Sequence, residues 1–351
     1  MGLFSHATVE SEQVATTVRQ HWDLELGKCI KASQNHTFGA EAKDGTKYIV
    51  RVTPNPTTLQ KIIDEITFVH YVAQSANLKG QICSFVPPNT ASSTTLYANW
   101  VVRNGDLLIV VSEFAKGEML DYQDRNSWMF DQRLVEACGR WLGSLHVASA
   151  AFCKEYPLVA ARIQRWDEVH DGVMQGSPLD RNDQIAEAKR DPKLYGILHG
   201  DVNCSNFFFS PHTGQLSVFD TDQVQQGWFM YDLAQPIFSP YLHSRALGMT
   251  DHVPKYTNWL VTGYESILGP NTVDRNALHR MLMLRKGLYD RFCRRALAEG
   301  DVPKDMKGFL EFIVNWLDRE KREMCMTRVL FGGAVVAAAF KMFWGRESTL
   351  H

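Results

Sequence analysis

The alternation of hydrophobic and polar positions predicts two hairpins in the first third of the chain. Two pairs of strand-like segments each flank a turn signal; they are 36–42 and 47–52 around Asp44-Gly45, and 94–102 and 107–114 around Asn104-Gly105. Asp-Gly and Asn-Gly favour the tight turns that join antiparallel strands, because both central residues take positive φ there. We therefore expect a sheet-rich region at the start of the chain.

One helix is predicted between these hairpins, over residues 57–75. Its apolar side chains recur at the spacing of one helix face and are Leu59, Ile62, Ile63, Ile66, Val69 and Val72. Beyond residue 114 helical spacing dominates. The helices expected there cover 131–149, 158–174, 255–268, 274–298, 304–321 and 323–343.

This change of pattern predicts an α+β protein with two lobes. Residues 1–113 would form a small N-terminal lobe made of a sheet and one helix, and residues 114–351 a larger, mostly helical C-terminal lobe. A chain of 351 residues is too long for one small core, which agrees with two lobes. A crevice between lobes is a natural place for a nucleotide.

A set of oxygen-bearing side chains interrupts the helical part. Asp201 and Asn206 lie five residues apart, and Asp220 ends a short hairpin formed by 207–209 and 216–219. This hairpin would bring Asp220 back beside Asn206, so that both side chains reach one Mg²⁺ ion, which prefers hard oxygen ligands. Phosphoryl transfer from ATP needs such groups, because an Asp accepts the hydroxyl proton while an Asn and an Asp hold the metal.

Asp and Asn are also common turn residues, so Asp201 and Asn206 could merely cap a turn. His199-Gly200 in front of Asp201 completes the spacing His-x-Asp-x-x-x-x-Asn of the protein-kinase catalytic loop. With the returning carboxylate of Asp220, this favours phosphoryl transfer over a simple turn. A protein kinase is disfavoured, because Thr221-Asp222 stands where such enzymes carry Phe-Gly.

A buried ion pair is predicted between Arg51 and Glu65. Arg51 lies in the apolar strand 47–52, where a guanidinium needs a partner, and Glu65 sits at the edge of the apolar face of the next helix. We expect the pair to aim the guanidinium at the ATP phosphates, as a lysine–glutamate pair does in kinases. A plain structural salt bridge is the alternative, and the two interpretations are compatible.

In these motifs the chain resembles the aminoglycoside phosphotransferase and choline kinase family, and more closely its homoserine-kinase-type members. The resemblance runs from about residue 33 to 238. The segments that carry it are 35–38, 48–51, 112–117, 142–146, 199–206, 219–222 and 231–234. It implies a bilobal protein-kinase-like fold that uses ATP and Mg²⁺.

The resemblance implies a role for each matching residue. Asp201 would be the catalytic base, with Asn206 and Asp220 as the Mg²⁺ ligands. Arg51 would contact the phosphates, with Glu65 orienting it. The residues implied to hold the rest of the nucleotide are Asn35 in the nucleotide loop and the backbone of Glu113, Phe114 and Ala115 in the interlobe hinge.

The resemblance also concerns two further acidic residues. Asp232 is implied to steady the catalytic loop from behind, which is a structural role. Asp222 either assists at the metal or the substrate, or has no function. The chain departs from the family in two places, since segment 32–35 has no glycine cluster and Arg51 replaces the commoner lysine. A nucleotide-binding pseudokinase or regulatory scaffold is therefore the alternative, although the complete set of acid and amide groups disfavours it.

Arg285 is the candidate for acceptor recognition. It falls on the apolar stripe of the predicted helix 274–298, where a guanidinium needs an anion. A substrate carboxylate or phosphate is one candidate, because arginine grips such groups with two hydrogen bonds, and an internal carboxylate is the other. The region 241–328 holds more Lys and Arg than Asp and Glu, which argues against polycationic aminoglycosides.

The composition is that of an ordinary soluble protein, with 45% hydrophobic and 22% charged residues. A net charge of −2 gives no reason to expect a nucleic-acid partner. Seven scattered cysteines without a Cys-x-x-Cys pair indicate reduced thiols in the cytoplasm. The apolar run 329–340 is too short to cross a bilayer and predicts a buried helix, and the start of the chain lacks the pattern of a signal peptide.

We therefore expect a cytoplasmic kinase that uses ATP and Mg²⁺ to phosphorylate a hydroxyl group of a small metabolite. Amino alcohols, hydroxy amino acids and sugar-like compounds are the acceptor classes that fit. No membrane or nucleic-acid partner is expected. The sequence leaves the oligomeric state and the choice between ATP and GTP open.

Overall fold

The structure of the protein is a computed structural model. It describes residues 9–32, 35–91, 97–120, 131–169, 191–246, 252–300, 302 and 306–322. The chain divides into two compact units, the first ending at Gly287 and the second beginning at Leu288. The predicted helix 323–343 and the apolar run 329–340 lie outside the described residues.

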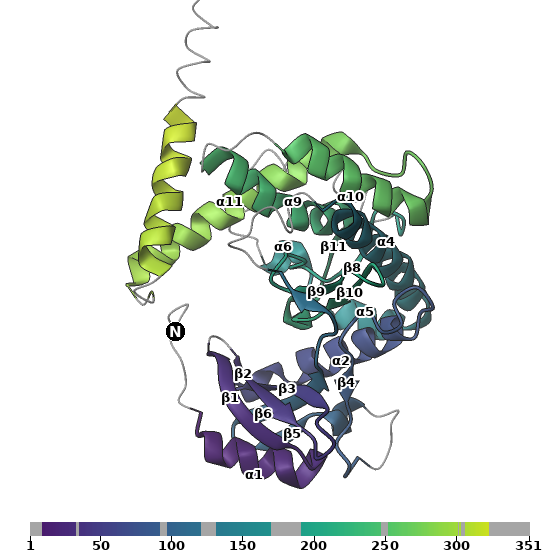
Figure 1. Cartoon of the computed structure of the whole chain (residues 1–351), viewed down its shortest axis with the longest axis vertical. Coiled ribbons are helices and arrows are strands. Elements are labelled where there is room, and N and C mark those ends of the chain that lie inside the picture. The colour runs from purple at the N-terminus through teal and green to yellow at the C-terminus, as the bar shows by residue number, and fades with distance from the viewer. Residues whose placement is uncertain are drawn as a thin grey trace, which may run out of the picture. The chain divides into compact units, whose positions relative to one another are not determined.

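An antiparallel sheet forms the N-terminal part of the first unit (Figure 1). Its strands are β1 (Glu25–Ala32), β2 (His36–Glu41), β3 (Lys47–Thr53), β4 (Phe85–Val86), β5 (Val102–Asn104) and β6 (Leu107–Glu113). Their order is β1-β2-β3-β6-β4, and β5 pairs with β6. Gly45 and Gly105 take positive φ values of 83° and 59° in the two turns. The two hairpins are therefore confirmed, but Asp44 and Asn104 do not take positive φ, so only the glycine of each pair has the expected conformation.

The predicted strand 94–102 is wrong. Residues 97–100 form the 3₁₀ helix η2 (Tyr97–Trp100), β5 begins only at Val102, and residues 94–96 lie outside the described residues. Aromatic packing explains the difference. Tyr97 and Trp100 both contact the ring of His70, each at a centroid distance of 5.3 Å, so this segment directs its rings toward His70 and does not extend the pairing with β6.

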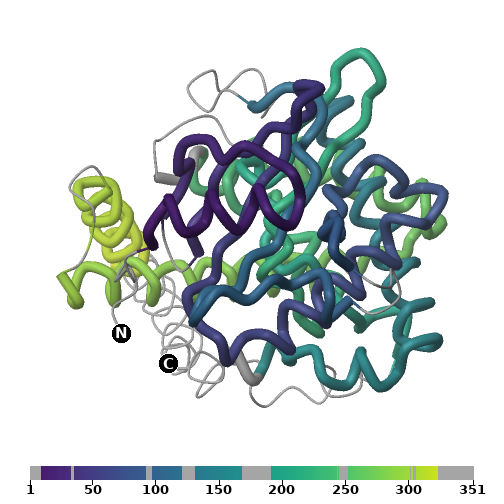
Figure 2. The backbone as a smooth tube through the Cα atoms, turned by 90° about the horizontal axis from the view of Figure 1, so that it is seen from below, coloured from purple at the N-terminus to yellow at the C-terminus, as the bar shows by residue number. Residues whose placement is uncertain are grey.

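Helix α1 (Ser11–Trp22) precedes the sheet and can be followed in Figure 2. It is not among the predicted elements, although Val14, Val18 and Trp22 recur at helical spacing. It packs three side chains against the strands; the core they form is Val14, Val18 and Trp22 with Phe38, Ala40, Val50, Val52, Ile109 and Val111. Burial of a valine or larger apolar side chain contributes about 1.5–3 kcal/mol. Helix α1 therefore stabilises one face of the sheet that carries Arg51.

The helix predicted over 57–75 is present as α2 (Leu59–Ala73), preceded by the 3₁₀ helix η1 (Pro56–Thr58). Its buried face carries apolar side chains and also two acidic residues, Asp64 and Glu65, each 3% exposed. Buried carboxylates need partners. Asp64 finds one in Arg162, whose Nη2 lies 2.6 Å from it.

The C-terminal part of the first unit is mostly helical, as expected. Its helices are α4 (Gln132–Glu155), α5 (Pro157–Arg162), α6 (Trp166–Val169), α9 (Phe229–Ala246), α10 (Val253–Leu268) and the beginning of α11 (Arg275–Glu299), which continues into the second unit. Short strands precede and separate these helices. They are β7 (Glu118–Met119), β9 (Phe207–Ser210) and β10 (Gln215–Val218) in one sheet, and β8 (Tyr195–Leu198) and β11 (Gln225–Trp228) in another.

Two of these helices differ from the sequence prediction. The helix expected over 158–174 ends at Arg162, because Ile163 is extended and Arg165 forms a bridge to Gln226; residues 170–174 lie outside the described residues. Helical periodicity does not predict α9, since Pro236 and Pro240 stand inside it and proline normally breaks a helix.

Helices α4 and α10 touch backbone to backbone through two glycines. A Cβ atom on Gly139 would lie 2.1 Å from the carbonyl oxygen of Leu260, and one on Gly263 would lie 2.1 Å from that of Glu136. Such distances are far below van der Waals contact, so only glycine fits at either position. The contact fixes α4, the helix that carries His146.

The second unit is described for residues 288–300, 302 and 306–322. It contains the end of α11 and a helix over 306–322, close to the predicted 304–321. Arg294 links the two helices by donating to Asp290 at 2.7 Å and to Asp318 at 2.6 Å. Within the described residues, no helix has both the length and the hydropathy needed to cross a membrane.

Candidate active site

The loop that contains the His-x-Asp motif joins β8 to β9 and is held by Asp232 at the start of α9. The backbone N–H groups of His199 and Gly200 donate to the two carboxylate oxygens of Asp232, at 3.0 and 2.9 Å. Asp232 is fully buried, and Nε2 of His146 lies 3.4 Å from it. Burial would raise the pKa of Asp232, but His146 and the backbone donors lower it. The expected structural role of Asp232 is confirmed.

Gly200 lets this loop pass close to the chain that returns after the hairpin. Its φ is +85°, and a Cβ atom there would lie 2.3 Å from the carbonyl oxygen of Gln223. Only glycine combines this backbone conformation with this close approach. The glycine between His199 and Asp201 is therefore required by the path of the loop.

His199 links the loop to the strand that leads to Asp220. Its Nε2 lies 3.1 Å from the carbonyl oxygen of Phe219, and its Nδ1 lies 3.4 Å from the backbone nitrogen of Asp201. A ring with its proton on Nε2 satisfies both contacts, because Nε2 then donates and Nδ1 accepts. One side chain thus helps to position both carboxylates.

Asn206 is oriented by Asp201. Its Nδ2 donates to the backbone carbonyl of Asp201 at 2.8 Å and to Oδ2 of the same residue at 3.1 Å. Both amide hydrogens are used in this way, and Oδ1, which accepts from the hydroxyl of Ser205 at 3.4 Å, keeps a second lone pair for a cation. The backbone carbonyl of Asn206 accepts from the N–H of Phe219 at 2.9 Å. The loop and the strand before Asp220 are therefore joined beside the expected metal ligands.

Asp220 follows β10 in a left-handed backbone conformation, with φ of 62°. Its side chain is 33% exposed, and the ammonium of Lys31 lies 3.6 Å from Oδ2. Mg²⁺ usually takes one or two carboxylates and completes its coordination with water and phosphate oxygens. No group of three or more His, Cys, Asp and Glu side chains suited to a metal occurs in the described residues. The oxygens of Asn206 and Asp220 fit Mg²⁺ that also binds phosphates.

The predicted ion pair between Arg51 and Glu65 is present. Nη1 and Nη2 of Arg51 donate to the two carboxylate oxygens at 2.9 and 2.6 Å. Burial would lower the pKa of Arg51, but Glu65 raises it above its usual value. Nε of Arg51 is buried without a partner among the described residues, and the ring of Phe85 lies 5.5 Å from the guanidinium carbon.

Glu65 and Asn35 connect the N-terminal sheet and α2 to the chain just after Asp220. The hydroxyl of Thr221 donates to Oε1 of Glu65 at 2.6 Å. Nδ2 of Asn35 donates to Asp222 at 3.0 Å, and Oδ1 of Asn35 accepts from the hydroxyl of Thr53 at 2.7 Å. Residues 33–34 of the expected nucleotide loop lie outside the described residues.

Asp222 is thus a partner of Asn35 and also accepts from the amide of Gln223 at 3.1 Å. Its burial, followed by the negative charge of Asp220, raises the pKa of its carboxyl. These contacts explain how Asp222 is held. Its part in metal or substrate binding stays a prediction.

The expected hinge, Glu113 to Ala115, follows β6. Glu113 is tied to Ser84, with its own N–H donating to the Ser84 carbonyl at 2.9 Å and its carboxylate accepting from the Ser84 N–H at 3.2 Å. The ring of Phe114 meets that of Phe208 edge to face at 6.0 Å. The hinge is therefore attached to the sheet on one side and to β9 on the other, and its contact with adenine stays a prediction.

Arg285 contacts the expected base. Its Nη2 donates to Oδ1 of Asp201 at 2.9 Å, and Phe238 lies 5.9 Å below the guanidinium carbon. Burial would lower the pKa of Arg285, but Tyr231 and Asp201 raise it. Of the two partners considered from the sequence, an internal carboxylate is the one present in this structure. A role toward the substrate stays a prediction.

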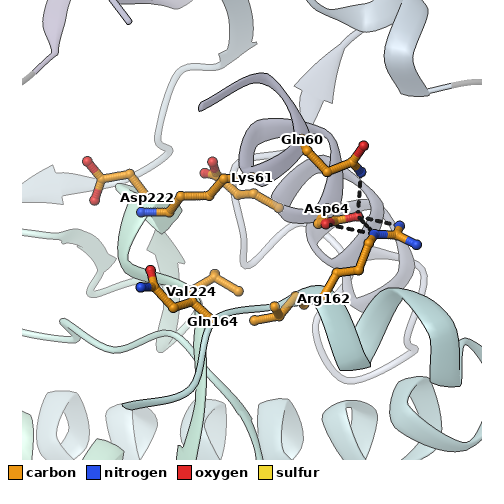
Figure 3. Close-up of a pocket in the computed structure, with 9 residues that line it drawn as sticks. Gln60, Lys61, Asp64, Arg162, Gln164, Asp222 and Val224 are labelled. Carbon is orange, nitrogen blue, oxygen red and sulfur yellow. Dashed lines mark hydrogen bonds and ion pairs between the residues drawn. The ribbon is translucent and has the colours of Figure 1, made fainter. Parts of the chain in front are cut away.

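A cavity of about 450 Å³ lies beside this site, and Glu65 of α2 is part of its lining. Its lining residues are Gln60, Lys61, Asp64, Glu65, Arg162, Ile163, Gln164, Asp222 and Val224. Figure 3 shows Lys61 extended toward Asp222, and Arg162 paired with Asp64 on the opposite wall. Asp201 is not part of the lining, so this cavity alone cannot be the place of transfer.

Some residues of the site are not singled out by sequence reasoning. Thr221 stands between two acidic residues of the motif, and this position is a signal that could have identified it as a site residue. Lys31 precedes the expected nucleotide loop, which is a weaker one. His146 lies in a segment that resembles the family, but nothing in the sequence shows that its ring reaches Asp232 and accepts or donates to Tyr264 at 2.8 Å.

The model of the Phosphotransferase enzyme family (APH) matches residues 32–239 of the chain. No curated protein is similar enough in sequence to match. Among solved structures, an amicoumacin kinase, hAmiN, in complex with AMP-PNP, Ca²⁺ and Ami has 18% sequence identity and a TM-score of 0.65, covering 89% of this chain and 94% of that chain.

Two other solved structures are similar over nearly the whole chain. An aminoglycoside phosphotransferase from Alicyclobacillus acidocaldarius has 14% identity and a TM-score of 0.54, covering 93% of this chain and 97% of that chain. A choline kinase from Streptococcus pneumoniae has 14% identity and a TM-score of 0.50, covering 90% of this chain and 99% of that chain. At such identities these likenesses show the fold, which is the expected kinase-like α+β fold.

Proposed function

Because the chain belongs to the Phosphotransferase enzyme family, we propose that it uses ATP and Mg²⁺ to phosphorylate a hydroxyl group of a small metabolite. The contact between Asn206 and Asp201 carries the proposal. The amide of Asn206 donates to Asp201 and keeps its own oxygen for a cation. A proton acceptor and a metal ligand therefore stand side by side, as phosphoryl transfer requires.

Asp201 is the proposed base. The acceptor oxygen forms a bond to the γ-phosphorus of ATP, and the bond from that phosphorus to the β,γ-bridging oxygen breaks, its electron pair leaving with ADP. The hydroxyl proton goes to the carboxylate of Asp201. Oδ2 of this carboxylate accepts from Asn206 and Oδ1 accepts from Arg285, and each oxygen keeps a second lone pair that can accept the acceptor hydroxyl.

Asn206 and Asp220 are the proposed metal ligands. Mg²⁺ bound there would supply positive charge that offsets the charge on the phosphates. Oδ1 of Asn206 and the carboxylate of Asp220 would hold it. Lys31 now lies 3.6 Å from that carboxylate, and its ammonium can turn to the phosphates when the divalent ion takes its place.

The nucleotide is proposed to lie between an N-terminal lobe, residues 1–113, and a C-terminal lobe, residues 114–351. Arg51, oriented by Glu65, would contact the phosphates. The backbone of Glu113, Phe114 and Ala115 would hold the adenine. Asn35 would position the nucleotide loop, since its amide is engaged by Thr53 and Asp222 on either side.

The acceptor is proposed to be an amino alcohol, a hydroxy amino acid or a sugar-like compound. Solved neighbours that carry the names of small-molecule kinases support a small acceptor, and the closer resemblance to homoserine-kinase-type members favours a hydroxy amino acid. The net charge of −2 and the scattered cysteines support a cytoplasmic protein without a nucleic-acid or membrane partner.

A nucleotide-binding pseudokinase is the second candidate. It is favoured by the glycine-poor segment 32–35 and by the ion pair that engages Asp201. ADP release and phosphorylated product, measured with the full-length chain, ATP and a panel of hydroxyl compounds, separate the two. Product that requires both Mg²⁺ and an acceptor supports the kinase, whereas ATP binding without product from any acceptor supports the pseudokinase.

A further inference from the structure

The guanidinium of Arg285 occupies an oxygen that the proposed base needs. Nη2 of Arg285 donates to Oδ1 of Asp201 at 2.9 Å, while the amide of Asn206 occupies Oδ2. An acceptor hydroxyl must come within hydrogen-bond distance of this carboxylate to give up its proton. Each carboxylate oxygen keeps a second lone pair, but the guanidinium occupies one of the two directions of approach to Oδ1. Movement of Arg285 away from Asp201 opens that direction to the acceptor hydroxyl.

Arg285 is not fully satisfied where it is. Its Nε is buried and has no hydrogen-bond partner among the described residues, which is an unfavourable state for a charged donor. The side chains of Arg285 and Asp201 are 24% and 29% exposed, so the pair lies at an accessible surface and not deep in the core. A ligand that offers Nε an acceptor is favoured over the present arrangement.

The guanidinium also selects the charge of whatever binds beside Asp201. An ammonium group placed there meets a like charge at short range, which disfavours its binding. An anion is attracted and can replace Asp201 as the partner. Asp201 itself indicates the group that suits this position, because its flat carboxylate is what the guanidinium now binds.

We propose that Arg285 recognises a carboxylate of the acceptor, which displaces Oδ1 of Asp201 and so frees the base for the acceptor hydroxyl. This inference rests on the proposed phosphoryl transfer and narrows its acceptors to hydroxy acids, hydroxy amino acids included. In this proposal the same guanidinium contacts Asp201 before the acceptor binds and the acceptor carboxylate afterwards. The hydroxyl and the carboxylate are therefore only a few carbon atoms apart in the acceptor.

Acceptors matched in shape test the proposal with the full-length chain, ATP and Mg²⁺. γ-Hydroxybutyrate and homoserine carry the carboxylate, γ-hydroxybutyramide is its neutral counterpart, aminobutanol is the cationic one, and glycerol phosphate carries a phosphate. Hydrogen bonds to a charged group contribute enough that kcat/KM for the carboxylates is expected to exceed that for the amide about 30-fold.

Substitution of Arg285 provides the second part of the test. Arg285→Met is expected to raise KM for the carboxylates about 30-fold and so to remove the preference for carboxylate over amide, and Arg285→Lys is expected to keep part of the preference. Arg280→Met is the matched control, since it removes a cation from the same helix that lies 3.9 Å from Asp274. Thermal unfolding of each variant checks that the fold is intact.

Several results overturn the proposal. They are equal turnover of amide and carboxylate, an unchanged preference in Arg285→Met, or a preference for glycerol phosphate over γ-hydroxybutyrate. If none of the acceptors is phosphorylated, the midpoint of thermal unfolding, measured in the presence of each acceptor, tests the proposal instead. A larger rise with γ-hydroxybutyrate than with its amide, lost in Arg285→Met, supports the proposal, and equal rises overturn it.

The proposed phosphoryl transfer is tested separately by the nucleotide. If Mg²⁺ and ATP do not raise the midpoint of thermal unfolding, the proposed nucleotide site is refuted, independently of the results with the acceptors. If the enzyme phosphorylates a cationic acceptor and Arg285→Met does not change that activity, only the proposed recognition of an acceptor carboxylate is refuted. The two failures are therefore distinguishable in the same set of measurements.

Discussion

The hydroxyl of Thr221 donates a 2.6 Å hydrogen bond to Oε1 of Glu65, the same oxygen that accepts from Nη1 of Arg51. A single carboxylate thus joins a strand of the N-terminal sheet, helix α2 and the residue that follows Asp220. The positions of Arg51, the proposed phosphate contact, and Asp220, the proposed metal ligand, are therefore linked through Glu65, which is 3% exposed.

Replacement of Glu65 by Gln is expected to disturb both stability and nucleotide binding. It leaves the buried guanidinium of Arg51 without a counter-charge, which costs about 3–5 kcal/mol. The affinity for Mg²⁺ and ATP should fall about tenfold or more, because Arg51 loses its orientation. Urea unfolding and nucleotide titration measure the two effects. Thr221→Val is the matched control, since it removes only the hydroxyl, and should cost about 1 kcal/mol. Equal effects of both variants would contradict this account.

Replacement of Asp201 by Asn is expected to abolish transfer and to spare nucleotide binding. A positioned general base contributes about 10²–10⁴-fold to the rate, so kcat should fall by that range while the dissociation constant of ATP stays nearly the same. Single-turnover product formation and ATP titration check both parts. Full activity of Asp201→Asn would refute the assignment of the base.

The two acids that flank Thr221 are expected to differ in their effect on metal dependence. Asp220→Asn should raise the Mg²⁺ concentration for half-maximal activity about tenfold or more, because it removes one of two protein ligands. Asp222→Asn should change it far less, because the carboxylate of Asp222 is already bound by Asn35 and Gln223. Mg²⁺ titrations at fixed ATP measure this. A larger effect for Asp222→Asn would reverse the assignment.

His146 is expected to make the fold sensitive to acid. Burial lowers its pKa below the ordinary 6.5, although Asp232 acts in the opposite direction. Above pH 6.5 both the folded and the unfolded chain keep it neutral, so its contribution to stability is complete. Below that pH the unfolded chain takes up a proton that the folded chain refuses, and stability falls by up to about 1.4 kcal/mol per pH unit until the folded pKa is reached.

The variant His146→Gln isolates this effect. Gln can donate to Asp232 and accept from Tyr264 without titrating, so the loss of stability from this site between pH 6.5 and 5 should disappear. Denaturant unfolding at a series of pH values measures the difference between wild type and variant. If the difference in unfolding free energy between wild type and variant is the same at every pH in that range, His146 does not contribute to the pH dependence of stability.

Contacts within one motif, or between neighbouring elements, are predictable from the sequence. Arg51 and Glu65 lie on a strand and on the next helix, and burial of a charged residue in an apolar strand demands a partner. Asp201 and Asn206 belong to one loop, and the hairpin that follows returns the chain to it, where the N–H of Phe219, next to Asp220, donates to the carbonyl of Asn206. The register of β9 with β10 then follows from the turn between them.

Contacts between distant elements are not predictable in this way. Arg285 meets Asp201 across 84 positions, and the apolar stripe around Arg285 shows only that some anion is needed. The segment 97–100 has strand-like residues, but its aromatic rings gain more by packing on His70. Helix α9 tolerates Pro236 and Pro240 because it is held by tertiary contacts that outweigh local preference.

The two glycines between α4 and α10 have an effect well beyond their own contact. Helix α4 carries His146, whose ring reaches Asp232, and Asp232 holds the backbone of His199 and Gly200. A methyl group added at Gly139 would push the helices apart and pass that shift, through one imidazole and one carboxylate, to the proton acceptor. Substitutions at the contact between α4 and α10 could therefore alter the turnover rate without changing any residue that contacts the substrate.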